Sequence, residues 1–275
     1  MNDAALIEPR PASTVLLLRD RAGGIEVLMV TRNVASDFAS GALVFPGGRV
    51  DAADDDAATL ACCRGVPGAD AAAMAFRVAA VRETFEEAHV LLARPKGAER
   101  LLAATEVGAL ETSLGSRLGR PPAFADIVAA GGIELATDLL LPFAHWITPV
   151  GPPKRFDTHF FLAPTPLDQV AAHDGREAVE TIWIAPQRAI DESEARRVTL
   201  VFATRMNLQK LARSRSVADA LAAARADTIV TVCPELVESP EGKLLRIPAA
   251  AGYGITEVPA NLTVRAWVPR GTGTP

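Results

Sequence analysis

The residues best suited to chemistry are acidic and lie close together in the segment Arg82–Val90, which reads RETFEEAHV. This segment ends an Ala-rich run, Ala71–Leu92, that contains neither Gly nor Pro and is therefore predicted to be helical. At helical spacing Glu83, Glu86 and Glu87 gather on one side, because residues three and four apart are neighbours. Their like charges repel one another and face the negative end of the helix dipole, so folding alone does not explain them.

A hard divalent cation would resolve this repulsion. Mg²⁺ takes oxygen ligands and is commonly shared between a few carboxylates and the phosphates of a substrate. The alternative is a solvated acidic helix face, which is what most charge runs are. The opposite side of the predicted helix carries apolar residues at core-facing spacing, namely Met74, Val78, Val81 and Phe85.

A glycine turn lies upstream of the acidic helix. The segment Gly41–Gly48 reads GALVFPGG, an apolar strand-like run that ends in Pro-Gly-Gly. Glycines in such a turn expose backbone groups and allow another group to approach closely. A turn of this kind favours a binding site over a plain acidic surface.

Together the two segments resemble the signature of the Nudix hydrolase family. That signature is a Gly, five residues, a Glu, seven residues, and then R-E-apolar-x-E-E-x-G-apolar. Gly48 matches the opening Gly, and Gly47 precedes it with a carbonyl that the family often offers to a metal ion. The R-E and E-E positions fall on Arg82, Glu83, Glu86 and Glu87.

The chain departs from the signature at several positions. The spacing between its two halves is longer, which indicates an insertion at 51–70. Met74 stands eight residues before the Arg, where the signature has its first Glu, and Asp51 or Asp54–Asp56 could supply a carboxylate instead. Thr84 replaces an apolar residue, and His89 replaces the late Gly. His is among the residues enriched in the left-handed conformation that such a Gly adopts at a helix end.

The pattern of the rest of the chain predicts strands that alternate with helices. Strand-like runs are Ser13–Arg19, Ile25–Arg32, Ala42–Phe45, Phe143–Thr148, Phe156–Leu162 and Glu177–Ile184. Helix-like runs are Ala98–Leu118, Pro122–Ala130, Leu200–Arg213 and Val217–Arg225, the last with Ser216 as N-cap. Strand-like runs around Ser239–Gly242 predict a late hairpin.

The resemblance implies an α/β (α+β) fold, a Nudix-type α/β/α sandwich with a mixed sheet, extra helices and a C-terminal β-hairpin extension. We expect a Nudix domain at 10–213, with a helical insertion at 97–131, and a C-terminal extension at 214–275 packed on the same domain. The extra helices are compatible with a homodimer, in which they would form a dimerisation element.

The implied activity is a metal-dependent hydrolysis of a diphosphate linkage in a nucleoside-diphosphate-linked compound. Mg²⁺ or Mn²⁺ would be held by Glu83, Glu86, Glu87 and the carbonyl of Gly47. Arg82 is expected to orient these carboxylates. The general base would be Glu83 or a Glu outside the signature, for which Glu177 and Glu180 are candidates.

The inserted signature resembles one subgroup, the peroxisomal-type coenzyme A diphosphatases and their bacterial relatives. The segments His145–Pro149 and Arg155–Ala163 resemble it too. This implies coenzyme A or acyl-coenzyme A as substrate, with Arg32, Lys154 and Arg155 as substrate-binding residues, although Asp37 replaces an Arg of the subgroup. Exposed surface charges are the alternative for these three basic residues.

Two other functions are compatible with the same signature. One is hydrolysis of ADP-ribose, dinucleotides or nucleotide sugars. The other is a catalytically silent Nudix-fold binding or regulatory module. His145 and His159 fall in strand-like runs, where a lone His more often satisfies a neighbour than binds a metal.

Composition narrows the class of protein. The 275 residues carry a net charge of −5 and a pI near 5.5, which argues against a nucleic-acid binder because such proteins usually show a basic face. No uncharged apolar run reaches the ~18 residues of a membrane span. Three cysteines without C-x-x-C spacing are expected to be reduced thiols in a cytoplasmic protein.

Overall fold

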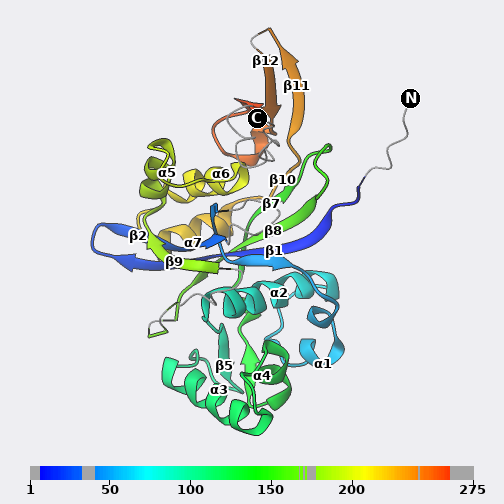
Figure 1. Ribbon diagram of the computed structural model, residues 1–275, viewed down its shortest axis with the longest axis vertical. Coiled ribbons are helices and arrows are strands. Elements are labelled where there is room, and N and C mark those ends of the chain that lie inside the picture. Colours follow the sequence, from blue (N-terminus) through cyan, green and yellow to red (C-terminus); the bar gives the residue numbers. More distant parts are fainter. Residues whose placement is uncertain are drawn as a thin grey trace, which may run out of the picture.

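A computed structural model describes residues 7–32, 41–166, 168–169, 171, 178–240 and 242–260. Its centre is a mixed eight-stranded sheet in the order β10-β7-β8-β1-β2-β3, with β4 added to β1 and β9 added to β2 (Figure 1). The strands are β1 (Arg10–Arg21), β2 (Gly24–Arg32), β3 (Leu43–Val44), β4 (Gly47–Arg49), β7 (Leu141–Ile147), β8 (Phe156–Pro164), β9 (Ala178–Ile184) and β10 (Thr231–Val232).

The first two strands organise the sheet. β1 and β2 form an antiparallel hairpin, and β1 pairs in parallel with β8 on its other side. Side chains alternate across β1, so that Val15 and Leu17 enter one hydrophobic core while Leu16 and Leu18 enter a second core behind it. A strand buried on both faces reads as a continuous apolar run, as it does here.

Helices cover both faces of the sheet. One face carries α2 (Ala71–Ala88), α3 (Ala104–Leu118) and α4 (Phe124–Ala130), and the other carries α5 (Pro186–Glu194), α6 (Phe202–Leu211) and α7 (Val217–Ala226) (Figure 1). The predicted α/β/α sandwich is thereby confirmed. Smaller elements are α1 (Ala57–Leu60), β5 (Ala93–Pro95), β6 (Ile133–Leu135), β11 (Glu235–Ser239), β12 (Gly242–Arg246) and β13 (Glu257–Pro259).

Helix α2 is enclosed more completely than its sequence predicts. The apolar side is buried at Val78, Val81 and Phe85, but Glu83 and Glu87 on the acidic side are buried as well. The acidic side is buried because it lies against the glycine turn instead of facing water. The helix ends at His89, whose φ of 58° is left-handed, as expected for the residue in place of the signature's Gly.

The C-terminal segment packs on the same sheet. β10 extends the sheet by parallel pairing with β7, and β11, β12 and β13 form a small sheet of their own. Tyr253 ties this segment to the sheet, because its hydroxyl accepts from Trp146 Nε1 at 2.8 Å and donates to Asn207 Oδ1 at 2.7 Å. Residues far apart in sequence thus share one core.

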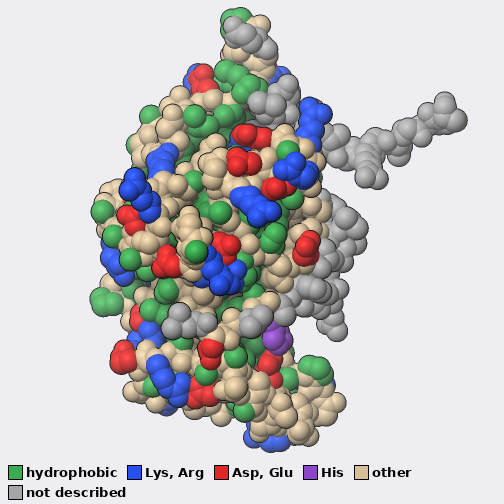
Figure 2. Space-filling view, turned by 90° about the vertical axis from the view of Figure 1, so that its left-hand side faces the viewer, with side chains coloured by type: hydrophobic (Ala, Val, Ile, Leu, Met, Phe, Trp, Pro, Cys, Tyr) green, Lys and Arg blue, Asp and Glu red, His purple; other side chains and the backbone are tan. Residues whose placement is uncertain are grey.

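The described residues contain no helix that could span a membrane, because none of their helices combines the necessary length and apolar character. On the face seen in Figure 2, basic and acidic side chains are interspersed.

Candidate active site

A cavity of about 800 Å³ lies where the glycine turn meets the acidic side of α2. Residues of the glycine turn, α2, β7, β8 and the start of α6 line it. The polar lining includes Thr14, Arg32, Asp51, Arg82, Glu83, Glu86, Glu87, Thr148, Thr158 and Thr204. The structure therefore brings the two halves of the signature into one site.

Arg82 is the centre of the polar network. Its Nη1 donates to Glu83 Oε1 at 2.8 Å and to Glu86 Oε2 at 2.9 Å, and its Nη2 donates to the carbonyl of Arg49 at 2.8 Å. Its Nε and Nη2 also hold both oxygens of Asp54, at 2.9 and 3.0 Å. Burial opposes the charge, yet the acidic partners keep the pKa of Arg82 above its usual value. Such a planar fork holds carboxylates in fixed directions, which is the role expected of Arg82.

Asp54 takes the position that the first Glu holds in the signature. It follows Gly48 after five residues, which is the spacing of the signature counted from its glycine end. Only 1% of Asp54 is exposed, and its carboxylate also accepts from the backbone N–H of Asp51 at 2.8 Å. The structure therefore favours Asp54 over Met74, and the inserted residues begin after Asp54. Counting forward from the glycine turn would have found it.

Both turn glycines leave room that a side chain would fill. A Cβ on Gly48 would lie 2.5 Å from Glu83 Oε1, and a Cβ on Gly47 would lie 2.4 Å from the carbonyl oxygen of Ser13. The N–H of Gly47 donates to Glu87 Oε2 at 2.9 Å. The turn thus contacts two of the acidic residues directly, and only residues without a side chain allow this approach.

The donors at this end of the cavity fit a hard divalent cation. Asp51, Glu83, Glu86 and Glu87 line it together, an excess of negative charge that Arg82 only partly balances. Burial raises the pKa of Glu86 despite the opposing charge of Arg82, and the nearby aspartates add to the rise. The three glutamates do not surround one point, because Arg82 lies between Glu83 and Glu86. Glu86 has the freedom to turn toward a cation, since 43% of its side chain is exposed.

The predicted substrate-binding residues do not share one place. Arg32 lines the cavity, and its Nε is buried without a hydrogen-bond partner among the described residues. Arg155 lies outside the cavity lining, where its guanidinium donates to the carbonyls of Thr148 and Ile7 at 3.0 and 2.7 Å. Lys154 is exposed and also outside the lining.

The candidates for the general base are likewise divided. Glu83 lines the cavity, whereas Glu180 is exposed on β9 outside the lining. Glu177 lies outside the described residues, as does Asp37. Of the carboxylates considered for this role, the structure places Glu83 in the cavity.

An apolar half of the cavity was missed by sequence reasoning. It is lined by Trp146, Phe156, Phe160, Phe202 and Leu245, and the rings of Trp146 and Phe202 meet edge to face at 5.5 Å. The sequence signal was weak, because these residues come from four separate elements and read as ordinary core positions. Their joint exposure to one cavity arises only in the folded chain.

Comparisons with known proteins agree with this geometry. The family model described as NUDT19 Nudix domain matches residues 64–211. Similar curated proteins are the acyl-coenzyme A diphosphatase NUDT19 of Gallus gallus, 32% identical over 64% of this chain and 58% of that protein, and its namesake of Homo sapiens, 29% identical over 72% and 63%. This chain therefore spans less than two thirds of the length of either relative.

Among solved structures, the crystal structure of a NUDIX hydrolase from Alicyclobacillus acidocaldarius is similar with a TM-score of 0.60 and 28% identity. The match covers 82% of this chain and 98% of that one. The likeness therefore extends over most of the sandwich described above.

Proposed function

Because this chain belongs to the Nudix hydrolase family, we propose that it hydrolyses a diphosphate linkage in a nucleoside-diphosphate-linked compound, with coenzyme A or acyl-coenzyme A as the leading substrate. The observation that carries the proposal is the network in which Arg82 holds Asp54, Glu83 and Glu86 at the cavity wall. The substrate class is supported by the acyl-coenzyme A diphosphatases among the similar proteins.

The carboxylates of the network would hold Mg²⁺ or Mn²⁺. Glu83, Glu86 and Glu87 would bind the ion, and the carbonyl of Gly47 remains a further candidate ligand. Such an ion, when bound, supplies positive charge that offsets the charge developing on the phosphoryl oxygens. Arg82 holds Glu83 in place, and the backbone N–H of Gly47 does the same for Glu87. Glu83 is the candidate to accept the proton of the attacking water.

The rest of the cavity suits the remainder of such a substrate. Arg32 would meet a phosphate, because its buried Nε lacks a hydrogen-bond partner in the described part of the chain and a guanidinium suits phosphate oxygens. The apolar half around Trp146 and Phe202 would take the base or the pantetheine and acyl portion. Lys154 and Arg155 keep a role in substrate binding only if their segment changes position.

Met74 in place of the first Glu and His89 in place of the late Gly would favour a silent binding module, but both departures have another explanation. Asp54 supplies the acidic partner of Arg82 that Met74 does not, and His89 adopts the left-handed end of α2 in place of Gly.

ADP-ribose, dinucleotides and nucleotide sugars remain alternative substrates, and a hydrolysis assay distinguishes them from coenzyme A. We also propose a cytoplasmic location, in keeping with its three free cysteines. A homodimer remains a prediction.

The test is product release from coenzyme A, acetyl-coenzyme A, ADP-ribose, NADH and a nucleotide sugar, with Mg²⁺ and with Mn²⁺. We expect phosphopantetheine and adenosine 3′,5′-bisphosphate from coenzyme A, only when the ion is present. Glu87→Gln should abolish release, whereas Glu180→Gln, the same change on an exposed β9 residue outside the cavity, should not. Binding without release in the unchanged protein would instead favour the silent module.

A further inference from the structure

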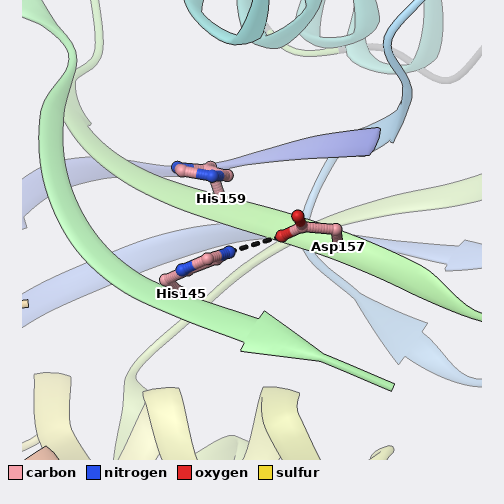
Figure 3. A group of neighbouring side chains, drawn as sticks. All are labelled: His145, Asp157 and His159. Carbon is pink, nitrogen blue, oxygen red and sulfur yellow. Dashed lines mark hydrogen bonds and ion pairs between the residues drawn. The ribbon is translucent and has the colours of Figure 1, made fainter. Parts of the chain in front are cut away.

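A second group of possible metal ligands lies on the central sheet, apart from the cavity. His145 on β7 pairs directly with His159 on β8, and Asp157 lies two residues before His159 on the same side of that strand. One donor atom from each of these residues lies within 4.8 Å of the others. Figure 3 shows the ring of His145 directed at Asp157, with the ring of His159 beside them.

This group faces away from the candidate active site. Phe156, Thr158 and Phe160 of β8 line the cavity, so the alternating residues Asp157 and His159 point to the other side of the sheet. There His159 packs on Phe76 of α2, with ring centroids 4.1 Å apart. Neither the hydrolysis proposed above nor the packing of the core requires two imidazoles and a carboxylate at this place.

The hydrogen bonds of His145 leave one of its ring nitrogens directed at the acid. Nδ1 lies 2.8 Å from Thr231 Oγ1 on β10, and Nε2 is in close contact with Asp157 Oδ1. If Nδ1 donates its proton to Thr231, the lone pair of Nε2 faces the carboxylate of Asp157, and a cation bound by both groups would relieve their repulsion. A metal-bound His commonly donates its other N–H in this way, which fixes the orientation of the ring.

His159 completes the set of ligands. Its ring lies between Phe76 and His145, at centroid distances of 4.1 and 4.2 Å, and makes no hydrogen bond with the described residues. A neutral imidazole offers the lone pair of one ring nitrogen to a metal ion. The ring of His159 is therefore available to an ion held by this group of donors.

We propose that His145, Asp157 and His159 bind one transition-metal ion of the Zn²⁺ type. This site is separate from the carboxylate cluster of Glu83, Glu86 and Glu87, which would hold a hard ion. Imidazole suits such ions, and zinc with three protein ligands keeps a fourth, open position for water. The ion would join β7 to β8 and, through Thr231, to the edge strand β10. Its role would be to stabilise the sheet on whose other side the cavity lies.

The competing arrangement is an ordinary His–Asp hydrogen bond. A proton on His145 Nε2 would then be shared with Asp157, and the Thr231 hydroxyl would donate to Nδ1. His159 would be only a packing residue. This arrangement predicts that Zn²⁺ changes the melting temperature and gives heat of binding only through the carboxylate cluster. The two arrangements therefore differ in both measurements.

The experiment uses the full chain carrying Glu87→Gln, which weakens the carboxylate site, after dialysis against a chelator. Zn²⁺ alone and Mg²⁺ alone are added, and the melting temperature and the heat of binding are measured. The variants in this background are His159→Phe, which keeps a ring between Phe76 and His145, and Asp157→Asn, which keeps shape but removes charge. Circular dichroism confirms that each variant is folded.

We expect one equivalent of Zn²⁺ to bind and to raise the melting temperature by about 5–10 °C when its concentration is a hundredfold above Kd. Mg²⁺ should have no such effect, and both variants should lose the response. The proposal is overturned if the parent chain shows no Zn²⁺ response, or if the response survives in either folded variant. The outcome is independent of hydrolase activity, because neither measurement requires turnover.

Discussion

At the scale of single residues, the site depends on one guanidinium that serves three acids. Arg82 is 9% exposed and binds Asp54, Glu83 and Glu86 together. Lysine carries the same charge, but its three N–H donors share one nitrogen, so it cannot reproduce a planar fork that holds two oxygens of one acid while bridging two others. The geometry of the carboxylates therefore depends on the shape of this side chain as well as on its charge.

Arg82→Lys should lower kcat by about tenfold to a hundredfold, in the range seen when a residue that orients metal ligands is lost. Arg205→Lys is the matched control, because Arg205 pairs with Glu194 at the surface, outside the cavity. Steady-state kinetics on the substrate found in the panel would check this. An unchanged kcat in Arg82→Lys would mean that the carboxylates hold their positions without the fork.

Gly48→Ala should disturb the site with little effect on the rest of the fold. The added Cβ would lie 2.5 Å from Glu83 Oε1, so the carboxylate must move away from its place beside Arg82. We expect turnover to fall about a hundredfold, because small displacements of positioned groups cost this much. Gly65→Ala is the control, since a Cβ there meets nothing within 4 Å. Equal turnover in both variants would contradict the close approach of the turn.

At the scale of elements, the end of α2 is set by a residue in the left-handed conformation. His89 has φ 58° and ψ 27°, its ring stacks on Phe85, and its Nε2 lies 3.1 Å from Glu111 Oε1. A non-glycine residue in this conformation costs about 1–2 kcal/mol relative to glycine, and the exposed pair with Glu111 returns little of it.

His89→Gly should therefore exceed His89→Ala in free energy of unfolding by about 1 kcal/mol, since both lack the ring and only alanine strains the backbone. Denaturant midpoints of the two variants would measure the difference. The comparison leaves the carboxylates in place, so turnover should be the same in both. Equal free energies of unfolding for the two variants would contradict the left-handed conformation of residue 89.

At the scale of the whole molecule, the C-terminal segment completes the core and one wall of the cavity. Pro234 and Leu245 line the cavity, and the buried hydroxyl of Tyr253 bridges Trp146 and Asn207. Residues 214–240 and 242–260 thus pack against the sheet that supports the site, and loosening them should affect both stability and the apolar half of the cavity.

Tyr253→Phe should lower the free energy of unfolding by about 1–3 kcal/mol. The change removes one hydroxyl and leaves the indole N–H of Trp146 and the amide oxygen of Asn207 buried without this partner. Thermal or denaturant unfolding of the full chain would show it, with a single cooperative transition expected. Separate transitions for the two parts of the chain would contradict a shared core.

The amino-acid sequence alone specified the fold class and marked the acidic residues of the candidate site. Alternating strand and helix patterns predicted the sandwich, and the spacing of Arg82, Glu83, Glu86 and Glu87 marked the acidic side of α2. The glycine turn could be recognised because only residues without a side chain permit such close approach. These are local properties, carried by periodicity and by the backbone limits of single residues, so a linear reading recovers them.

Tertiary structure alone decided which residues share a place. Counting forward from Gly48 gives Asp54 and counting back from Arg82 gives Met74, and the folded chain decides between them because it places Asp54 against Arg82. Arg32 came to the cavity while Arg155 turned to backbone carbonyls, although both are basic residues at strand ends. His145 and His159 became partners through strand register. Contacts between distant segments depend on chain closure and packing, and neither is encoded in the spacing of neighbouring residues.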